Sequence, residues 1–265
     1  MTAAGPLDML PVRRDRFFLL AGLFGVCGVA WAYTIALARH GAAHGPADLL
    51  LGVQARPWTA SELGTTFVMW GVMMVAMMAP MAAPMLLALA RIGRAQPDAS
   101  GPLLPATGFL LGYLGIWTGF SLAATLAQWH LHELALVSAQ GASRDPVFAG
   151  ALLLGAGAFQ LTPLKQACLT RCRSPLLFLM SAWRPGAWGG LRMGILHGGF
   201  CLGCCWALMA LMFVGGTMNL LWCAGLMLLM LAEKLLPPGR AVSHGVGIVL
   251  MVFGSYTLLA GWTGG

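Results

Sequence analysis

The segment HGGFCLGCCWALM, residues 197–209, contains one histidine and three cysteines but no charged residue. His197, Cys201, Cys204 and Cys205 are spaced i, i+4, i+7 and i+8, so they would share one face of an α-helix. Cysteine and histidine are ligands for soft and borderline metals such as copper(I) and zinc. A disulfide within one regular helix is sterically poor. The spacing therefore indicates a metal site, and packing of small side chains is the alternative interpretation.

A second pair of thiols lies upstream in QLTPLKQACLTRCRSPL, residues 160–176. Cys168 and Cys172 are four residues apart and would share a face if this stretch is helical. Lys165, Arg171 and Arg173 surround them, and nearby cations favour the thiolate, which is the form that binds metal or attacks disulfides. We expect a charged, accessible loop here, whose two cysteines receive or deliver metal.

Methionines are concentrated in FVMWGVMMVAMMAPMAAPML, residues 67–86. On a helix they form two adjacent stripes, which contain Met77, Met78 and Met81 near the middle and inner part of the segment. A thioether is a soft donor that suits copper(I), although methionine stripes also fill irregular gaps in protein cores. We treat these three methionines as candidate ligands that complete the cysteine site.

The composition indicates the elements that must position these residues. The chain has 265 residues, of which 59% are hydrophobic and 9% charged, against about 25% charged in a soluble domain. Apolar spans long enough to cross a bilayer recur along it. We therefore expect an all-α protein, a polytopic transmembrane helical bundle that forms a single domain over residues 1–265. The predicted helices are Phe17–Ala38, Leu63–Leu89, Pro105–Trp129, Pro146–Leu164, Leu191–Val214, Leu220–Leu235 and Val242–Trp262.

The formal charge of +7 is distributed in the loops between the apolar spans. With the N-terminus inside the cell, one side holds most of the Lys and Arg residues: Arg13, Arg14, Arg16, Arg91, Arg94, Lys165, Arg171, Arg173, Arg184, Arg192, Lys234 and Arg240. Only Arg39, Arg56 and Arg144 then lie outside. This asymmetry predicts an inner-membrane protein with its N-terminus in the cytoplasm and its C-terminus outside, in contact with the lipid bilayer and not with nucleic acid.

The helix that carries the cysteines begins near Arg192 on the cytoplasmic side. With a rise of about 1.5 Å per residue, its cysteines reach the middle of a bilayer about 30 Å thick. Gly194, Gly198, Gly199 and Gly203 form small-xxx-small patterns that allow a second helix to approach closely. We expect the methionine helix, Leu63–Leu89, to be that partner. Glu233 and Lys234 are interpreted as an ion pair at the inner end of their helix.

Four segments together resemble a family of bacterial integral membrane proteins described as predicted metal-binding. They are WGVMMVAMMAPMAAPM, QLTPLKQACLTRCRSPLLFL, HGGFCLGCCWALMALMFVGGTMNLLW and EKLLPPG. The resemblance implies a fold of several helices and a metal-related role for the cysteines, without specifying a reaction.

The first functional hypothesis is therefore the handling of a soft metal, in transport, delivery or sensing, with a protein that donates or accepts the metal as partner. The many methionines and the absence of carboxylates within the predicted membrane spans favour copper(I), with zinc as the alternative. The second hypothesis is a membrane thiol–disulfide oxidoreductase, and the third is a structural subunit of a membrane complex. A non-enzymatic role is favoured, and the chain has no phosphate-binding loop that would couple it to ATP.

Overall fold

The computed structural model describes residues 10–43, 58–95, 103–236 and 239–263. Within these ranges the chain is helical and has no β-strand, and its only strand-like pairings are the isolated bridges Val137–Ser143 and Ala142–Gly215. The prediction of an all-α helical bundle is therefore confirmed.

Each of the seven predicted helices has a counterpart in the structure. The helices are α1 (Leu10–Ala43), α3 (Ala60–Ala95), α4 (Leu103–Glu133), α5 (Pro146–Gln160), α6 (Pro163–Arg173), α7 (Pro175–Ala182), α8 (Gly186–Ala210), α9 (Met212–Gly215), α10 (Leu220–Leu235) and α11 (Gly239–Thr263). The segment between α5 and α8 was expected to be a loop but forms α6 and α7. Each of these short helices begins with a proline, which is well suited to the first position of a helix because it needs no N–H partner there.

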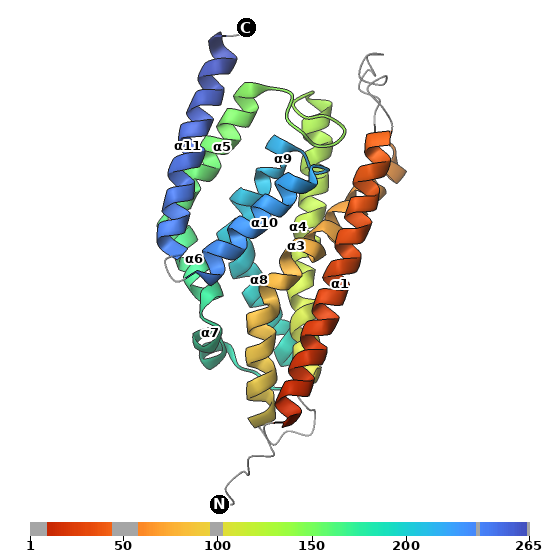
Figure 1. The fold of residues 1–265 in the computed structure, drawn as a ribbon, viewed down its shortest axis with the longest axis vertical. Coiled ribbons are helices and arrows are strands. Elements are labelled where there is room, and N and C mark those ends of the chain that lie inside the picture. Colours follow the sequence, from red (N-terminus) through yellow and green to blue (C-terminus); the bar gives the residue numbers. More distant parts are fainter. Residues whose placement is uncertain (1–9, 44–57, 96–102, 237–238, 264–265) are drawn as a thin grey trace, which may run out of the picture.

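Two groups of helices pack side by side (Figure 1). Helices α1, α3, α4 and α8 form one group, and α5 and α11 form a separate pair. The helices α6 and α10 link the two groups through contacts with one another, with α8 and with α3 and α11. The first residue of α1 and the last residue of α11 lie at opposite ends of the bundle (Figure 1).

Glycines allow the closest helix contacts. A Cβ atom on Gly190 or Gly194 of α8 would overlap the carbonyl oxygen of Pro105 or Phe109 in α4. Helices α5 and α11 also pack closely at glycines, because a Cβ atom on Gly150 would lie 2.9 Å from a backbone oxygen of α11. Small residues of this kind let helix backbones approach one another in an apolar environment.

Within the described residues, five helical segments are long and apolar enough to span a membrane: α1, α3, α4, α8 together with α9, and α11. Helices α5 and α6 would pass the same test as a pair, but they are bent by 65° at the residues between them. Helix α10 has 16 residues, which is shorter than the roughly 20 that a straight span needs. The number of membrane crossings therefore stays a prediction.

Burial is distributed unevenly over the apolar helices. The seven methionines of α3 are all buried: Met69, Met73, Met74, Met77, Met78, Met81 and Met85. Helix α11 is mostly exposed. Only 11% of the residues in its apolar segment are buried, and Val252, Phe253 and Leu259 are exposed. The bundle therefore has a methionine-rich interior and an apolar exterior.

Candidate metal centre

Three cysteines from two helices converge in the interior. The sulfur atoms of Cys172 in α6 and of Cys201 and Cys204 in α8 all lie within 4.8 Å of one another. All three side chains are buried, and all seven cysteines of the chain are free thiols. A metal–thiolate bond of about 2.3 Å, the value for zinc, places two sulfur ligands of one ion about 3.8 Å apart at a tetrahedral angle and about 4.6 Å apart in a linear arrangement. The three thiols therefore fit a single metal ion with little movement.

Helix α8 fixes the direction of its own thiols. Cys201 and Cys204 are separated by one turn, which places them on the same face. The thiols of Cys204 and Cys205 both donate to the carbonyl oxygen of Cys201, at 3.1 and 2.9 Å. Cys205 is buried beside this pair but does not belong to the group of three sulfurs within 4.8 Å.

A buried ion pair anchors α6, the helix that supplies Cys172. The ammonium group of Lys165 lies 2.7 Å from the carboxylate of Glu233 in α10, and both side chains are almost fully buried. The side chain of Gln160, at the end of α5, accepts from Lys165 and donates to Glu233. Lys165 and Cys172 are seven residues apart and so lie on the same face of α6. The ion pair therefore holds the cysteine-bearing face toward the bundle interior.

Helix α3 reaches the site through two backbone carbonyl groups. The hydroxyl group of Tyr113 in α4 donates to the carbonyl oxygen of Met78 at 3.0 Å and lies 3.3 Å from the sulfur of Cys201. The ammonium group of Lys234 donates to the carbonyl oxygen of Met81 at 2.7 Å. Lys234 also interacts electrostatically with the cysteine cluster. Tyrosine and lysine thus connect the methionine helix to the three thiols.

His197 lies one turn before Cys201 and is almost completely buried. Its ring contacts the rings of Phe109, Tyr113 and Phe178, with centroid distances of 5.6, 6.0 and 5.4 Å. Neither ring nitrogen has a hydrogen-bond partner within the described residues. A buried polar group without a hydrogen-bond partner costs free energy, and a bound metal or water molecule at either nitrogen would remove that cost. His197 is not among the three residues whose ligand atoms converge.

The remaining predicted ligands lie around the cluster. Cys168 is half-buried on α6, and a Cβ atom added to Gly203 of α8 would come within 2.9 Å of its sulfur. Met77, Met78 and Met81 are all buried in α3, as described above. The sequence predicted two separate cysteine sites, one in a loop and one in a membrane helix. In the structure Cys172 of the first site lies with Cys201 and Cys204 of the second.

Three sequence-based expectations were wrong. The stretch around Cys172 is a helix whose Lys165 and Cys172 are buried, because Glu233 provides a carboxylate inside the bundle. Glu233 consequently pairs with Lys165 and not with Lys234.

The glycine face of α8 packs closely against α4 and not against the methionine helix α3. Gly190 and Gly194 meet the backbone of α4, whereas Gly203 faces Cys168 of α6.

Sequence reasoning overlooked Tyr113 and Gln160. Both are polar side chains within or at the end of apolar segments, where a polar group needs a hydrogen-bond partner. That signal could have identified them as part of an interior polar site, although it could not have named their partners.

Comparison with known proteins identifies the family. A family model described as PpoB2, copper chaperone, matches residues 67–257. The chain belongs to this family. The PpoB2 match covers most of the chain and includes α6, α8 and the part of α3 from residue 67 on, which carry the methionines and the converging cysteines. It confirms the metal-related part of the resemblance, while the PpoB2 description does not mention a membrane. No curated protein and no solved structure matches the chain significantly.

Proposed function

We propose that this protein is a membrane-embedded copper chaperone, which binds copper(I) at Cys172, Cys201 and Cys204 and passes it to an acceptor protein. The observation that carries the proposal is the convergence of three buried sulfur atoms within 4.8 Å, supplied by two helices. The copper chaperone description of the PpoB2 family supports the identity of the metal. Thiolates are the soft ligands that suit copper(I).

Charge supports the binding of metal at this position. Lys234 is buried, and the carboxylate next to it in sequence, Glu233, is already paired with Lys165. A buried cation needs an opposite charge nearby. Copper(I) bound by the thiolates of Cys172, Cys201 and Cys204 has a net charge of −2, or −1 if one of the three stays a neutral thiol, so a bound complex is anionic and would balance Lys234. This balance favours an anionic metal–thiolate complex over three neutral thiols.

The other predicted ligands have secondary roles in this proposal. His197, whose ring nitrogens have no hydrogen-bond partner among the described residues, and the half-buried Cys168 each lie one helical turn before a cysteine of the centre. They would bind the metal as it enters or leaves. The thioethers of Met77, Met78 and Met81 would offer further soft donors from α3. Cys205 would take part through its hydrogen bond to Cys201.

A location in the inner membrane is supported by the apolar exterior. Large hydrophobic side chains are exposed on α1 and α11, among them Phe24, Val29, Val249 and Phe253. A soluble protein rarely exposes contiguous apolar surface of this extent. The charge asymmetry of the sequence supports an orientation with the N-terminus in the cytoplasm.

Metal analysis of the purified protein tests the proposed function. The parent protein should bind copper(I) in preference to zinc. Replacing a residue that only contacts a metal ligand lowers metal affinity roughly 10- to 100-fold, and Cys172→Ser should lower it by more. Cys223→Ser is the matched control, because Cys223 is equally buried but its thiol faces the carbonyl oxygen of Thr217, at 3.5 Å. Copper binding that survives both Cys172→Ser and Cys201→Ser would contradict the assignment.

A second candidate function, thiol–disulfide exchange, is favoured by the proximity of Cys172 to the thiols of α8. Oxidation of Cys172 and Cys201 to a disulfide would release two protons and two electrons to a quinone. Counting free thiols in metal-free protein treated with a quinone distinguishes the two functions. A chaperone centre keeps all seven thiols, whereas an oxidoreductase loses two reversibly.

A further inference from the structure

A fourth buried thiol, that of Cys205, adjoins the three-cysteine centre. Cys205 lies one turn after Cys201 on α8 and is almost completely buried. The thiol of Cys201 interacts with the thiols of Cys172, Cys204 and Cys205, so it lies at the middle of the group. The sulfur of Cys205 is not within 4.8 Å of all the other three. One metal ion therefore does not reach all four thiols as they are placed.

The four thiols face two different neighbours of α8. Residues 204 and 205 lie on either side of residue 201 around the helix, since an α-helix has 3.6 residues per turn. On the side of Cys204 lies α6, which supplies Cys172. On the side of Cys205 lies α4, whose Tyr113 interacts with both Cys205 and Cys201. Cys201 therefore lies between two sulfur atoms toward α6 and one sulfur atom toward α4.

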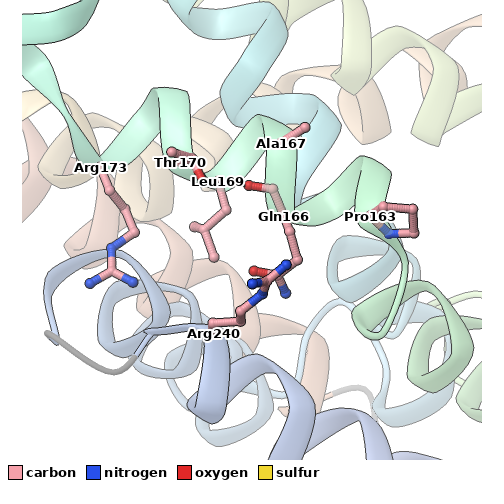
Figure 2. A pocket seen from close by; sticks show the side chains of 7 residues that line it. All are labelled: Pro163, Gln166, Ala167, Leu169, Thr170, Arg173 and Arg240. Carbon is pink, nitrogen blue, oxygen red and sulfur yellow. Dashed lines mark hydrogen bonds between the residues drawn. The ribbon is translucent and has the colours of Figure 1, made fainter.

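Helix α6 directs its cysteines toward α8 and not toward the pocket on its flank. That pocket of about 340 Å³ is lined by residues of α6 and by Arg240 of α11 (Figure 2). None of its lining residues is a cysteine or a methionine, and the guanidinium group of Arg173 there donates to the carbonyl oxygen of Leu236. The sulfur ligands of α6 therefore belong to the site at α8.

The charge of the site allows a second copper(I) ion beside the first. One copper(I) ion held by the thiolates of Cys172, Cys201 and Cys204 has a net charge of −2. A second copper(I) ion and the thiolate of Cys205 together add no net charge, because the two charges cancel and the thiol proton is released to water. This neutral addition matters because an uncompensated charge inside an apolar bundle is costly.

We propose that the centre is binuclear, with two copper(I) ions that share the thiolate of Cys201. One ion is also bound by Cys172 and Cys204, and the other is also bound by Cys205. The proposal rests on the copper-binding function proposed above and adds a second ion to it. Copper(I) is a soft ion that two thiolates suffice to hold. A thiolate sulfur keeps lone pairs after binding one ion, so Cys201 bridges the two.

The experiment measures the copper content of the purified full-length protein in detergent. The protein is loaded with copper(I) under reducing conditions and dialysed against a weak copper(I) chelator. We expect the parent to retain two copper ions per chain and Cys205→Ser to retain one, a twofold loss. X-ray absorption should show copper–copper scattering in the parent and none in Cys205→Ser. Cys223→Ser is the matched control and should retain two ions, because Cys223 is equally buried but its thiol faces the carbonyl oxygen of Thr217.

Each other result has a defined meaning. One ion in the parent, two ions without copper–copper scattering, or two ions in Cys205→Ser would overturn the binuclear centre. A parent with one ion leaves the chaperone proposal intact, whereas a parent without copper overturns both proposals. Thermal unfolding of the copper-free variants shows whether Cys205→Ser is folded, and Cys205→Ala provides a second variant that should also retain one ion. The copper count and the scattering of the parent decide the question even if neither variant folds.

Discussion

Lys165 of α6 and Glu233 of α10 form a buried ion pair, with 2.7 Å between the ammonium nitrogen and a carboxylate oxygen. The pair lies in a hydrogen-bonded group with Gln160 and joins three helices. It is therefore a buried polar contact that helps to fix α6, and with it the thiol of Cys172, relative to the rest of the bundle.

Breaking this pair should destabilise the protein. Glu233→Ala leaves a buried lysine without its carboxylate, and removing one partner of a buried ion pair typically costs about 3–5 kcal/mol. Thermal or denaturant unfolding in detergent measures the loss. The double variant Lys165→Met, Glu233→Leu removes both charges together and should be much closer to the parent protein. Equal stability of parent and Glu233→Ala would show that the pair does not anchor α6.

The glycine face of α8 provides a second test. Gly194→Leu should strongly destabilise the protein, because any Cβ atom there overlaps the backbone of α4 at Phe109. Gly199→Leu is the matched control on the same helix, since no neighbouring atom lies within 4 Å of a Cβ at that position. Unfolding temperatures that fall equally in both variants would contradict this packing.

Lys234 is predicted to set the charge of the metal centre. Lys234→Met removes the cation that interacts with the cluster and should weaken copper(I) binding about 10-fold or more, as other outer-shell changes do. Lys234→Arg retains the charge and should bind copper(I) more tightly than Lys234→Met. Competition with a copper(I) chelator measures both affinities. Unchanged affinity in Lys234→Met would show that the bound complex needs no counter-charge from this side chain.

Topology is tested with reporter fusions. A reporter attached after Gly265 should behave as periplasmic, and one attached near Ser174 as cytoplasmic, because the end of the bundle that holds most Lys and Arg residues is predicted to face the cytoplasm. The test also shows whether the short helix α10, with 16 residues, crosses the membrane. If it does not, the number of crossings changes by one and the C-terminus lies on the other side. A cytoplasmic signal at Gly265 would contradict the orientation with the C-terminus outside.

The sequence predicted most helices because each is a long apolar run with clear boundaries. Residues 165–190 were misread, since their charges resemble those of a loop. That interpretation assumed that Lys165 and the residues around Cys172 face water. The carboxylate of Glu233 comes from a helix far along the chain, and no local pattern shows that it neutralises Lys165 inside the bundle.

The sequence by itself determined the helical class and the face shared by His197, Cys201, Cys204 and Cys205, because both depend on local composition and on helical periodicity. Only the tertiary structure decided that Cys172 completes a group of three sulfurs and that His197 lies in an aromatic enclosure. These relationships depend on which helices are neighbours and on how closely they approach. The contact between the glycines of α8 and the backbone of α4, and the ion pair between α6 and α10, set those distances between residues remote in sequence.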